Sequence, residues 1–149
     1  MERSIFNTLP MLFFIYSSEG IYLDVLGGNE KKIVENAKKL AGFHINDVFE
    51  ENMANFISEK LTEVVSFNKS FSFTYAISID HFKDKSHTDL LHKPHWFEVN
   101  VSPILDEYNK VSKIFWSQFS VQHYKEQLNK LEEEKKELKA ELETLKQEN

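Results

Sequence analysis

The chain has 149 residues, a formal net charge of −6 and no cysteine. This length allows one globular domain with a well-buried core plus a separate helix. No stripe of Lys and Arg accompanies the acidic charge, so direct nucleic-acid binding is not expected. The absence of cysteine excludes disulfides, thiolate metal sites and thiol catalysis, and it fits a reducing, cytoplasmic location.

Residues 1–10 are expected to form a short leading helix. Ile5, Phe6 and Leu9 recur at a loosely helical spacing, and Pro10 then disfavours helix at the residue before it. The longest apolar run follows directly, from Met11 to Tyr16, and it is far shorter than the ~20 residues that a membrane helix needs. We therefore expect no membrane insertion.

Two strands, Met11 to Tyr16 and Ile21 to Leu26, are predicted to form a hairpin across a Ser-Ser-Glu-Gly turn. Strict alternation in the second strand would place Ile21, Leu23 and Val25 on one face and the intervening residues on the other.

Three helical segments are predicted next. The first runs from Glu30 to Leu40, with Asn29 as its N-cap and Gly42 marking its end. A short turn of helix covers residues 45–49, and a longer amphipathic helix covers residues 53–68, where apolar residues recur at i, i+3 and i+4.

The last part of the domain is predicted to consist of three strands, Phe71 to Ile79, Trp96 to Ile104 and Val111 to Val121. The order is thus two strands, helices, then three strands, which is unlike a regularly alternating parallel fold. Residues 11–120 are expected to form an α+β domain with one five-stranded antiparallel sheet and the helices on one of its faces.

Residues 121–149 have the seven-residue repeat of a coiled coil. The a and d positions, which would form the seam, are Val121, Tyr124, Leu128, Leu131, Lys135, Leu138, Leu142 and Leu145. Only Lys135 interrupts the apolar seam, and the flanking e and g positions are Glu, Lys or Gln.

The charges favour a parallel homodimer. A parallel pair places Glu134 against Lys139 and Glu141 against Lys146 of the partner helix, whereas an antiparallel pair would oppose acidic g residues to one another. The helix has no stop signal, so we expect the natural protein to continue beyond Asn149.

Three sequence segments together form a recognisable pattern. They are Leu40-Ala41-Gly42, Asp47-Val48-Phe49 and His95-Trp96-Phe97-Glu98-Val99-Asn100-Val101-Ser102-Pro103-Ile104. They resemble the pattern LxG, DLF and WFEVxxSPI of the PAS family of sensory domains. The resemblance extends over almost the whole chain. It departs from the family in a longer loop over residues 80–95, and in Ser120-Val121-Gln122, which stands where many members have Asp-Ile-Thr between domain and output helix.

The resemblance implies a module that senses a ligand, cofactor or partner and relays the change through its coiled coil to an effector such as a histidine kinase. A strand that leads into a two-stranded coil without Gly or Pro is suited to transmit a tilt or register shift. The alternatives are a dimerisation scaffold without a ligand, and the input domain of a transcriptional regulator. The flavin–cysteine adduct of light-sensing members is excluded because there is no cysteine.

An interior cavity for a small apolar or aromatic ligand is expected between the long helix and the last strands, with bulky side chains that simply fill the space as the alternative. Its expected lining residues are Phe56, Ile57, Leu61, Phe97, Val99, Val101, Ile114, Trp116 and Gln118. Gln118 falls where the resemblance places a flavin-contacting glutamine. It can equally be an ordinary polar residue of a strand.

Histidines offer weak candidates for metal or cofactor binding. Haem is not expected, because the long helix lacks His and His44 is more typical of a capping residue. Four further histidines share the loop with Asp80, Asp84 and Asp89, at spacings that match no standard metal signature; they are His81, His87, His92 and His95. This loop can be a polar connection, a metal site or a pH-sensitive segment.

We expect no enzymatic activity from this chain. It contains no glycine-rich phosphate loop and no nucleophile or metalloprotease motif. Asp24 and Glu98 are the only strand carboxylates considered for acid–base chemistry, and both alternate with apolar residues that are expected to face inward.

Overall fold

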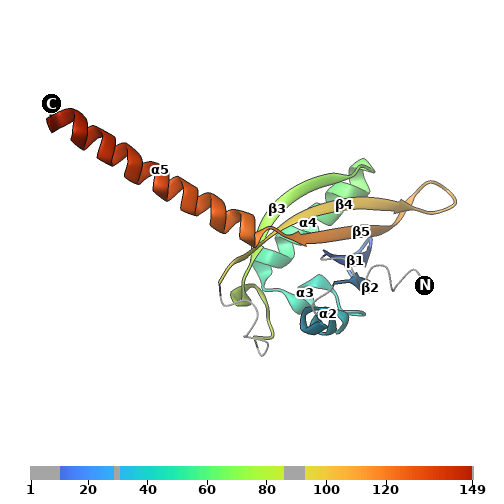
Figure 1. Cartoon of the computed structure of the whole chain (residues 1–149). Coiled ribbons are helices and arrows are strands. Elements are labelled where there is room, and N and C mark those ends of the chain that lie inside the picture. The colour runs from blue at the N-terminus through green and yellow to red at the C-terminus, as the bar shows by residue number, and fades with distance from the viewer. Residues whose placement is uncertain (1–10, 29–30, 86–92, 149) are drawn as a thin grey trace.

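One five-stranded sheet forms the centre of the protein (Figure 1). The structure is a computed structural model and describes residues 11–28, 31–85 and 93–148. In chain order the elements are β1 (Met11–Ser17), β2 (Tyr22–Gly27), α2 (Lys31–Lys38), α3 (Ile45–Val48), α4 (Glu51–Phe67), β3 (Phe71–Ile77), the 3-10 turn η1 (Ile79–His81), β4 (His95–Leu105), β5 (Val111–Ser120) and α5 (Gln122–Glu148).

The strands lie in the order β2-β1-β5-β4-β3, and every neighbouring pair is antiparallel. The first and last strands of the domain, β1 and β5, therefore pair at the middle of the sheet. The predicted α+β fold class with a five-stranded antiparallel sheet is confirmed. The predicted leading helix over residues 1–10 and the Asn29 cap lie outside the described residues.

The longest domain helix, α4, packs on one face of the sheet through a continuous apolar stripe. Ile57, Leu61 and Val64 on this stripe are fully buried, and each such side chain stabilises the fold by about 1.5–3 kcal/mol. The helix ends at Asn68, which has a left-handed backbone with φ 48° and donates its N–H to the carbonyl oxygen of Val64. Asparagine is one of the few residues other than glycine that adopts this cap conformation readily.

The predicted alternation of β2 is wrong, because the first hairpin contains a β-bulge. Tyr16 pairs with Tyr22 and Ile15 pairs with Asp24, so Leu23 is an extra residue without a partner in the ladder. Leu23 is 43% exposed instead of facing the core with Val25. Tyr22 takes its place in the interior, where it is only 2% exposed.

Gly27 at the end of β2 is held in a crowded left-handed conformation, with φ +82°. A Cβ atom there would lie 2.7 Å from the carbonyl oxygen of Met11 and 2.7 Å from a ring carbon of Phe13. Gly42 has a similar φ of +92°, but a Cβ at that position meets nothing within 4 Å. The two glycines thus share the same backbone requirement and differ in the space around them.

Gly27→Ala should therefore destabilise the domain clearly more than Gly42→Ala. The conformational cost common to both is about 1 kcal/mol, and the crowding at Gly27 adds on the order of 1–3 kcal/mol through displacement of the β1–β2 ladder. Urea unfolding of both variants measures the difference. Equal losses would show that Met11 and Phe13 move aside without cost.

Candidate functional site

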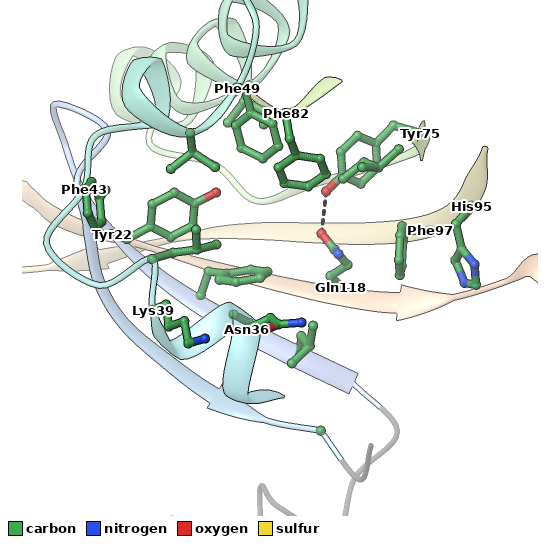
Figure 2. Close-up of a pocket in the computed structure, with 18 of the residues that line it drawn as sticks. Tyr22, Asn36, Lys39, Phe43, Phe49, Tyr75, Phe82, His95, Phe97 and Gln118 are labelled. Atoms are coloured by element: carbon green, nitrogen blue, oxygen red, sulfur yellow. Dashed lines mark hydrogen bonds between the residues drawn. The ribbon is translucent and has the colours of Figure 1, made fainter. Parts of the chain in front are cut away.

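A cavity of about 710 Å³ lies between the sheet and the helices α2 and α3 (Figure 2). This volume falls in the range of pockets that hold small molecules. Its sheet wall includes Phe14, Tyr16, Tyr75, Phe97 and Gln118, and its opposite wall includes Ala37, Leu40, Val48, Phe49, Ile57 and Phe82. Most of these side chains are apolar or aromatic, so the cavity is suited to a largely apolar ligand.

The inner wall carries one polar cluster, centred on Gln118 of β5. The amide oxygen of Gln118 accepts hydrogen bonds from the Tyr75 hydroxyl and, at 3.2 Å, from the indole N–H of Trp116. Gln118 is 7% exposed and Tyr75 is 7% exposed. The two strands that hold them, β3 and β5, flank β4, so the contact crosses the sheet on its inner face.

Three buried tyrosines, Tyr16, Tyr22 and Tyr75, also line the cavity. Burial raises the pKa of all three hydroxyls, because the charged phenolate would lose its hydration. The proximity of Tyr22 raises the pKa values of Tyr16 and Tyr75 further. All three are therefore neutral hydroxyls that can donate or accept a hydrogen bond.

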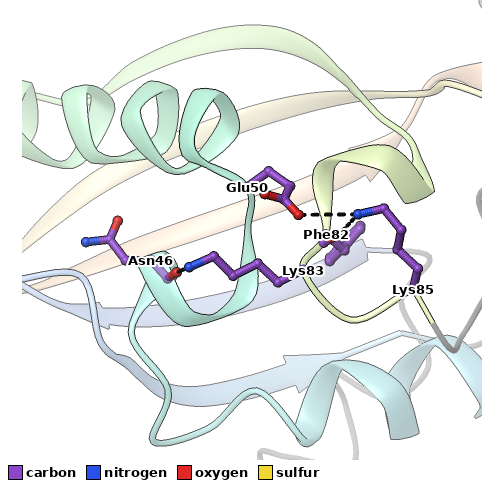
Figure 3. Close-up of polar contacts among 5 residues, drawn as sticks. All are labelled: Asn46, Glu50, Phe82, Lys83 and Lys85. Atoms are coloured by element: carbon purple, nitrogen blue, oxygen red, sulfur yellow. Dashed lines mark hydrogen bonds and ion pairs between the residues drawn. The ribbon is translucent and has the colours of Figure 1, made fainter.

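The segment after β3 closes one side of the cavity. Phe82 pairs with Phe49 in an isolated β-bridge, and their ring centroids are 4.9 Å apart. Figure 3 shows the polar contacts behind this wall. Lys83 Nζ donates to the carbonyl oxygen of Asn46, and Lys85 Nζ lies 3.3 Å from a carboxylate oxygen of Glu50. The segment is thus attached to α3 and to the start of α4.

Three of the nine expected lining residues, Ile57, Phe97 and Gln118, do line the cavity. The other six lie elsewhere in the packed interior: Phe56, Leu61, Val99, Val101, Ile114 and Trp116. They belong to the core in which α4 contacts β4 and β5. The cavity is displaced from there toward α2 and α3.

Two of the candidate histidines, His44 and His81, make structural hydrogen bonds. His44 caps α3, because its Nδ1 accepts the N–H of Asn46 at 3.0 Å while its Nε2 lies 2.7 Å from the carbonyl oxygen of Glu19. His81 Nδ1 accepts the N–H of Ser78 at 2.9 Å. His87 and His92 lie outside the described residues, and among those described no three His, Asp or Glu side chains gather as metal ligands would.

The base of α5 is attached to the first residues of β4. The N–H of Val121 donates to the carbonyl oxygen of Trp96 at 3.0 Å, and the N–H of Trp96 donates to Oε1 of Gln122 at 2.9 Å. Lys125 Nζ lies 4.7 Å from the centroid of the Trp96 ring. Where many PAS domains have Asp-Ile-Thr, a glutamine side chain therefore makes the bond between domain and helix.

The same junction borders the cavity. Ser120, the last residue of β5, and His95, the first residue of β4, both line it, and His95 Nε2 lies 2.7 Å from the Ser120 hydroxyl. Beyond this point α5 leaves the domain (Figure 1), and every residue from Glu126 to Glu148 is exposed. No helix in the described residues is long and apolar enough to cross a membrane.

Sequence patterns did not identify the three tyrosines and Phe82 as cavity residues. Tyr16 and Tyr75 occupy inward positions of strands whose alternation was recognised, so strand parity was a usable signal for them. Tyr22 faces inward because of the bulge, and Phe82 follows a non-periodic turn. Neither position carries a periodic signal.

No protein-family model matches the chain, and no curated protein matches it. Solved structures do match. The PAS domain of a protein from Colwellia psychrerythraea has a TM-score of 0.61 at 13% identity, covering 82% of this chain and 95% of that chain. A sensory box sensor histidine kinase from Vibrio cholerae has a TM-score of 0.54 at 15% identity, covering 80% and 87%.

VqmA of Vibrio cholerae, in a structure described as bound to DPO, has a TM-score of 0.60 at 12% identity. The match covers 80% of this chain and 56% of VqmA, so the chain spans about half of that protein's length. At these identities the likeness concerns the fold. The chain has the fold of PAS sensory domains, which confirms at that level the resemblance seen in its sequence.

Proposed function

We propose that this chain is the sensory module of a cytoplasmic signalling protein. It binds a small molecule in the cavity and relays the change through α5, paired in a parallel coiled coil, to an effector such as a histidine kinase. The observation that carries the proposal is the continuity between the cavity wall and the base of α5. Ser120 lines the cavity, and the next two residues bond to Trp96.

This continuity gives ligand binding a direct route to the helix. A molecule that fills the cavity contacts Phe97 or Ser120 and so alters the spacing of β4 and β5 at their paired ends. Because the first turn of α5 is bonded to Trp96, the helix follows that displacement. A packed two-stranded coil has few discrete arrangements, so a small shift at its base can be passed on as a change of tilt or register.

The exposed leucines of α5 support the dimer. Leu128, Leu131, Leu138, Leu142 and Leu145 are each at least 51% exposed on the isolated chain. They share one stripe at a and d spacing, and such a row of apolar side chains is stable in water only when covered. A second copy covers it with the attractive charge pairs described above.

Two kinds of effector are compatible with the neighbours. One similar structure belongs to a sensor histidine kinase, and VqmA is described as a LuxR-type receptor solved with ligand and DNA. The second supports an input domain of a transcriptional regulator as the alternative. In either case the chain in hand senses and relays and has no enzymatic activity of its own.

A cavity-filling substitution tests ligand binding. Ile79→Trp adds a ring from η1 into the cavity, whereas Ile104→Trp enlarges a half-buried β4 side chain that lies outside the lining. Native mass spectrometry of protein purified from its own host should show a co-purified small molecule with the parent and with Ile104→Trp. Ile79→Trp should lose at least ~90% of it, since overlap with a buried ring costs more than 1.4 kcal/mol.

Hydrogen exchange on the same samples tests the relay. Amides at the base of α5 should exchange more slowly in the ligand-bound parent than in Ile79→Trp, because the ligand holds the β4–β5 end together. If no mass co-purifies and no metabolite in a panel raises the melting temperature, the chain is a ligand-free dimerisation scaffold.

A further inference from the structure

Only one of the two polar atoms of the Gln118 amide makes hydrogen bonds to other described residues. Both hydrogen bonds that it makes, from the Tyr75 hydroxyl and from the Trp116 indole, go to its oxygen Oε1. Its nitrogen Nε2 has no hydrogen-bond partner among the described residues. Every buried side-chain N or O atom of the described residues has a hydrogen-bond partner. Since Nε2 has none, it is not buried. Nε2 is therefore accessible from the cavity that Gln118 lines.

The chemistry of Trp116 fixes which way this amide is turned. An indole N–H only donates, so the atom that faces it at 3.2 Å must be the amide oxygen and not the nitrogen. The Tyr75 hydroxyl bonds to the same oxygen, so neither hydrogen bond uses the N–H groups of Nε2. Trp116 is 1% exposed and Tyr75 7% exposed, so both positioning residues are held rigidly by the core.

The surroundings of this donor are uncharged. Lys39, Asp47 and Asp84 also line the cavity, but their side chains are exposed, at its solvent side. The other polar side chains of the lining are those of Asn36, His95, Ser120, Gln118 and the tyrosines, and none of them carries a fixed charge. A charged ligand group would lose its hydration there without an opposite charge to compensate, whereas a neutral acceptor loses little and gains a hydrogen bond.

Aromatic rings surround the amide on several sides. Figure 2 shows Phe97 beside Gln118 in the view, and Tyr75, Phe82 and Phe49 above it. The Tyr75 and Phe97 ring centroids are 6.2 Å apart. Rings arranged in this way present faces and edges that complement a flat aromatic molecule.

On the basis of the sensory function proposed above, we propose that the cavity selects an uncharged, planar aromatic ligand with a hydrogen-bond acceptor. A ring nitrogen or a carbonyl oxygen of the ligand accepts an N–H of Gln118. Tyr75 and Trp116 act as positioning residues, because they hold the amide with its donors turned toward the ligand.

Two probes of nearly equal size test this selection on the full chain. Quinoline is a neutral bicyclic acceptor without a donor, and indole is a neutral bicyclic donor without a lone-pair acceptor. Titration of ¹⁵N-labelled protein is followed by the side-chain amide signals of Gln118 and the indole signal of Trp116. Quinoline should bind roughly three- to tenfold more tightly than indole, the usual effect of one buried hydrogen bond, and should shift both Gln118 amide protons.

Two substitutions of Gln118 change the donor and keep the side chain's length. Gln118→Glu retains an oxygen for Tyr75 and Trp116, and at a pH high enough to ionise its carboxyl it presents only acceptors to the cavity, so under that condition the preference should reverse in favour of indole. Gln118→Met removes the donor, and the two probes should then bind within about twofold of each other. The parent titration and Gln118→Met decide the matter if Gln118→Glu does not fold.

The outcomes separate this inference from the sensory function. If both probes shift cavity signals but bind equally well to the parent, the cavity binds small molecules and Gln118 does not select them, which overturns the inference alone. If neither probe shifts any cavity signal up to millimolar concentration while a charged metabolite does bind, the inference is wrong and ligand sensing stands. If nothing binds, both fail.

Discussion

Leu138→Glu should convert the dimer into a folded monomer. Leu138 is a d position in the middle of the seam and is 65% exposed on the single chain. The substitution removes two buried leucines from each dimer, at about 2 kcal/mol each, and opposes two carboxylates in their place. The dissociation constant should rise at least on the order of a thousandfold.

Sedimentation equilibrium at tens of micromolar measures this change. Ala140→Glu is the matched control, because Ala140 faces outward in the heptad and should leave the dimer intact. The domain should remain folded in both variants, since the helix beyond Glu126 is exposed and does not contribute to the core. A parent chain that sediments as a monomer at this concentration would falsify the parallel coil.

The second large effect is a loss of stability at alkaline pH. Tyr16, Tyr22 and Tyr75 have raised pKa values in the folded state, whereas in the unfolded chain they titrate near 10.0. Below about pH 10 the hydroxyls are protonated in both states and their contribution is fully present. Above it the unfolded chain releases up to three protons that the folded chain retains, so stability should fall by up to about 4 kcal/mol per pH unit.

Urea unfolding between about pH 8 and pH 11 gives this slope. Tyr16→Phe should reduce it by about 1.4 kcal/mol per pH unit, because one buried group no longer titrates. Tyr108→Phe is the control for the loss of a hydroxyl, since Tyr108 is 75% exposed in the folded protein and does not line the cavity. The same slope in Tyr16→Phe as in the parent would mean that Tyr16 is not protected from ionisation.

The fold was predictable because its signals are local. The strands and α4 carry period-2 and period-3.6 apolar patterns, and the order of elements then limits the sheet to an antiparallel arrangement. The β2 bulge was not predictable, because Leu23 and Tyr22 are both apolar enough to face inward and only the register with β1 decides between them. The seam of α5 stays a prediction, since a single chain presents it uncovered.

The cavity was predicted less completely than the fold, because its position depends on contacts between segments that are distant in the sequence. A cavity is the space that packing leaves over, so its position depends on how α2, α3 and the segment around Phe82 lie against the sheet. Periodicity identifies Leu61 and Val99 as buried but cannot tell a packed layer from the wall of a cavity. Gln118 was singled out only because of its position in the family resemblance, and its hydrogen bonds with Tyr75 and Trp116 became visible in the structure.

The attachment of α5 at Trp96 also has a mechanical consequence. The helix spans 27 residues, so at 1.5 Å per residue it is about 40 Å long. Among the described residues, its attachments to the domain are in its first turn, through Val121, Gln122 and Lys125. This turn acts as the fulcrum of a lever, and a rotation of about 5° there displaces the far end by about 3.5 Å. Movements of a few tenths of an ångström at the sheet are thus amplified about tenfold at the C-terminal end of the helix. The stiffness of the bonds to Trp96 determines what fraction of the sheet's movement is passed to the helix.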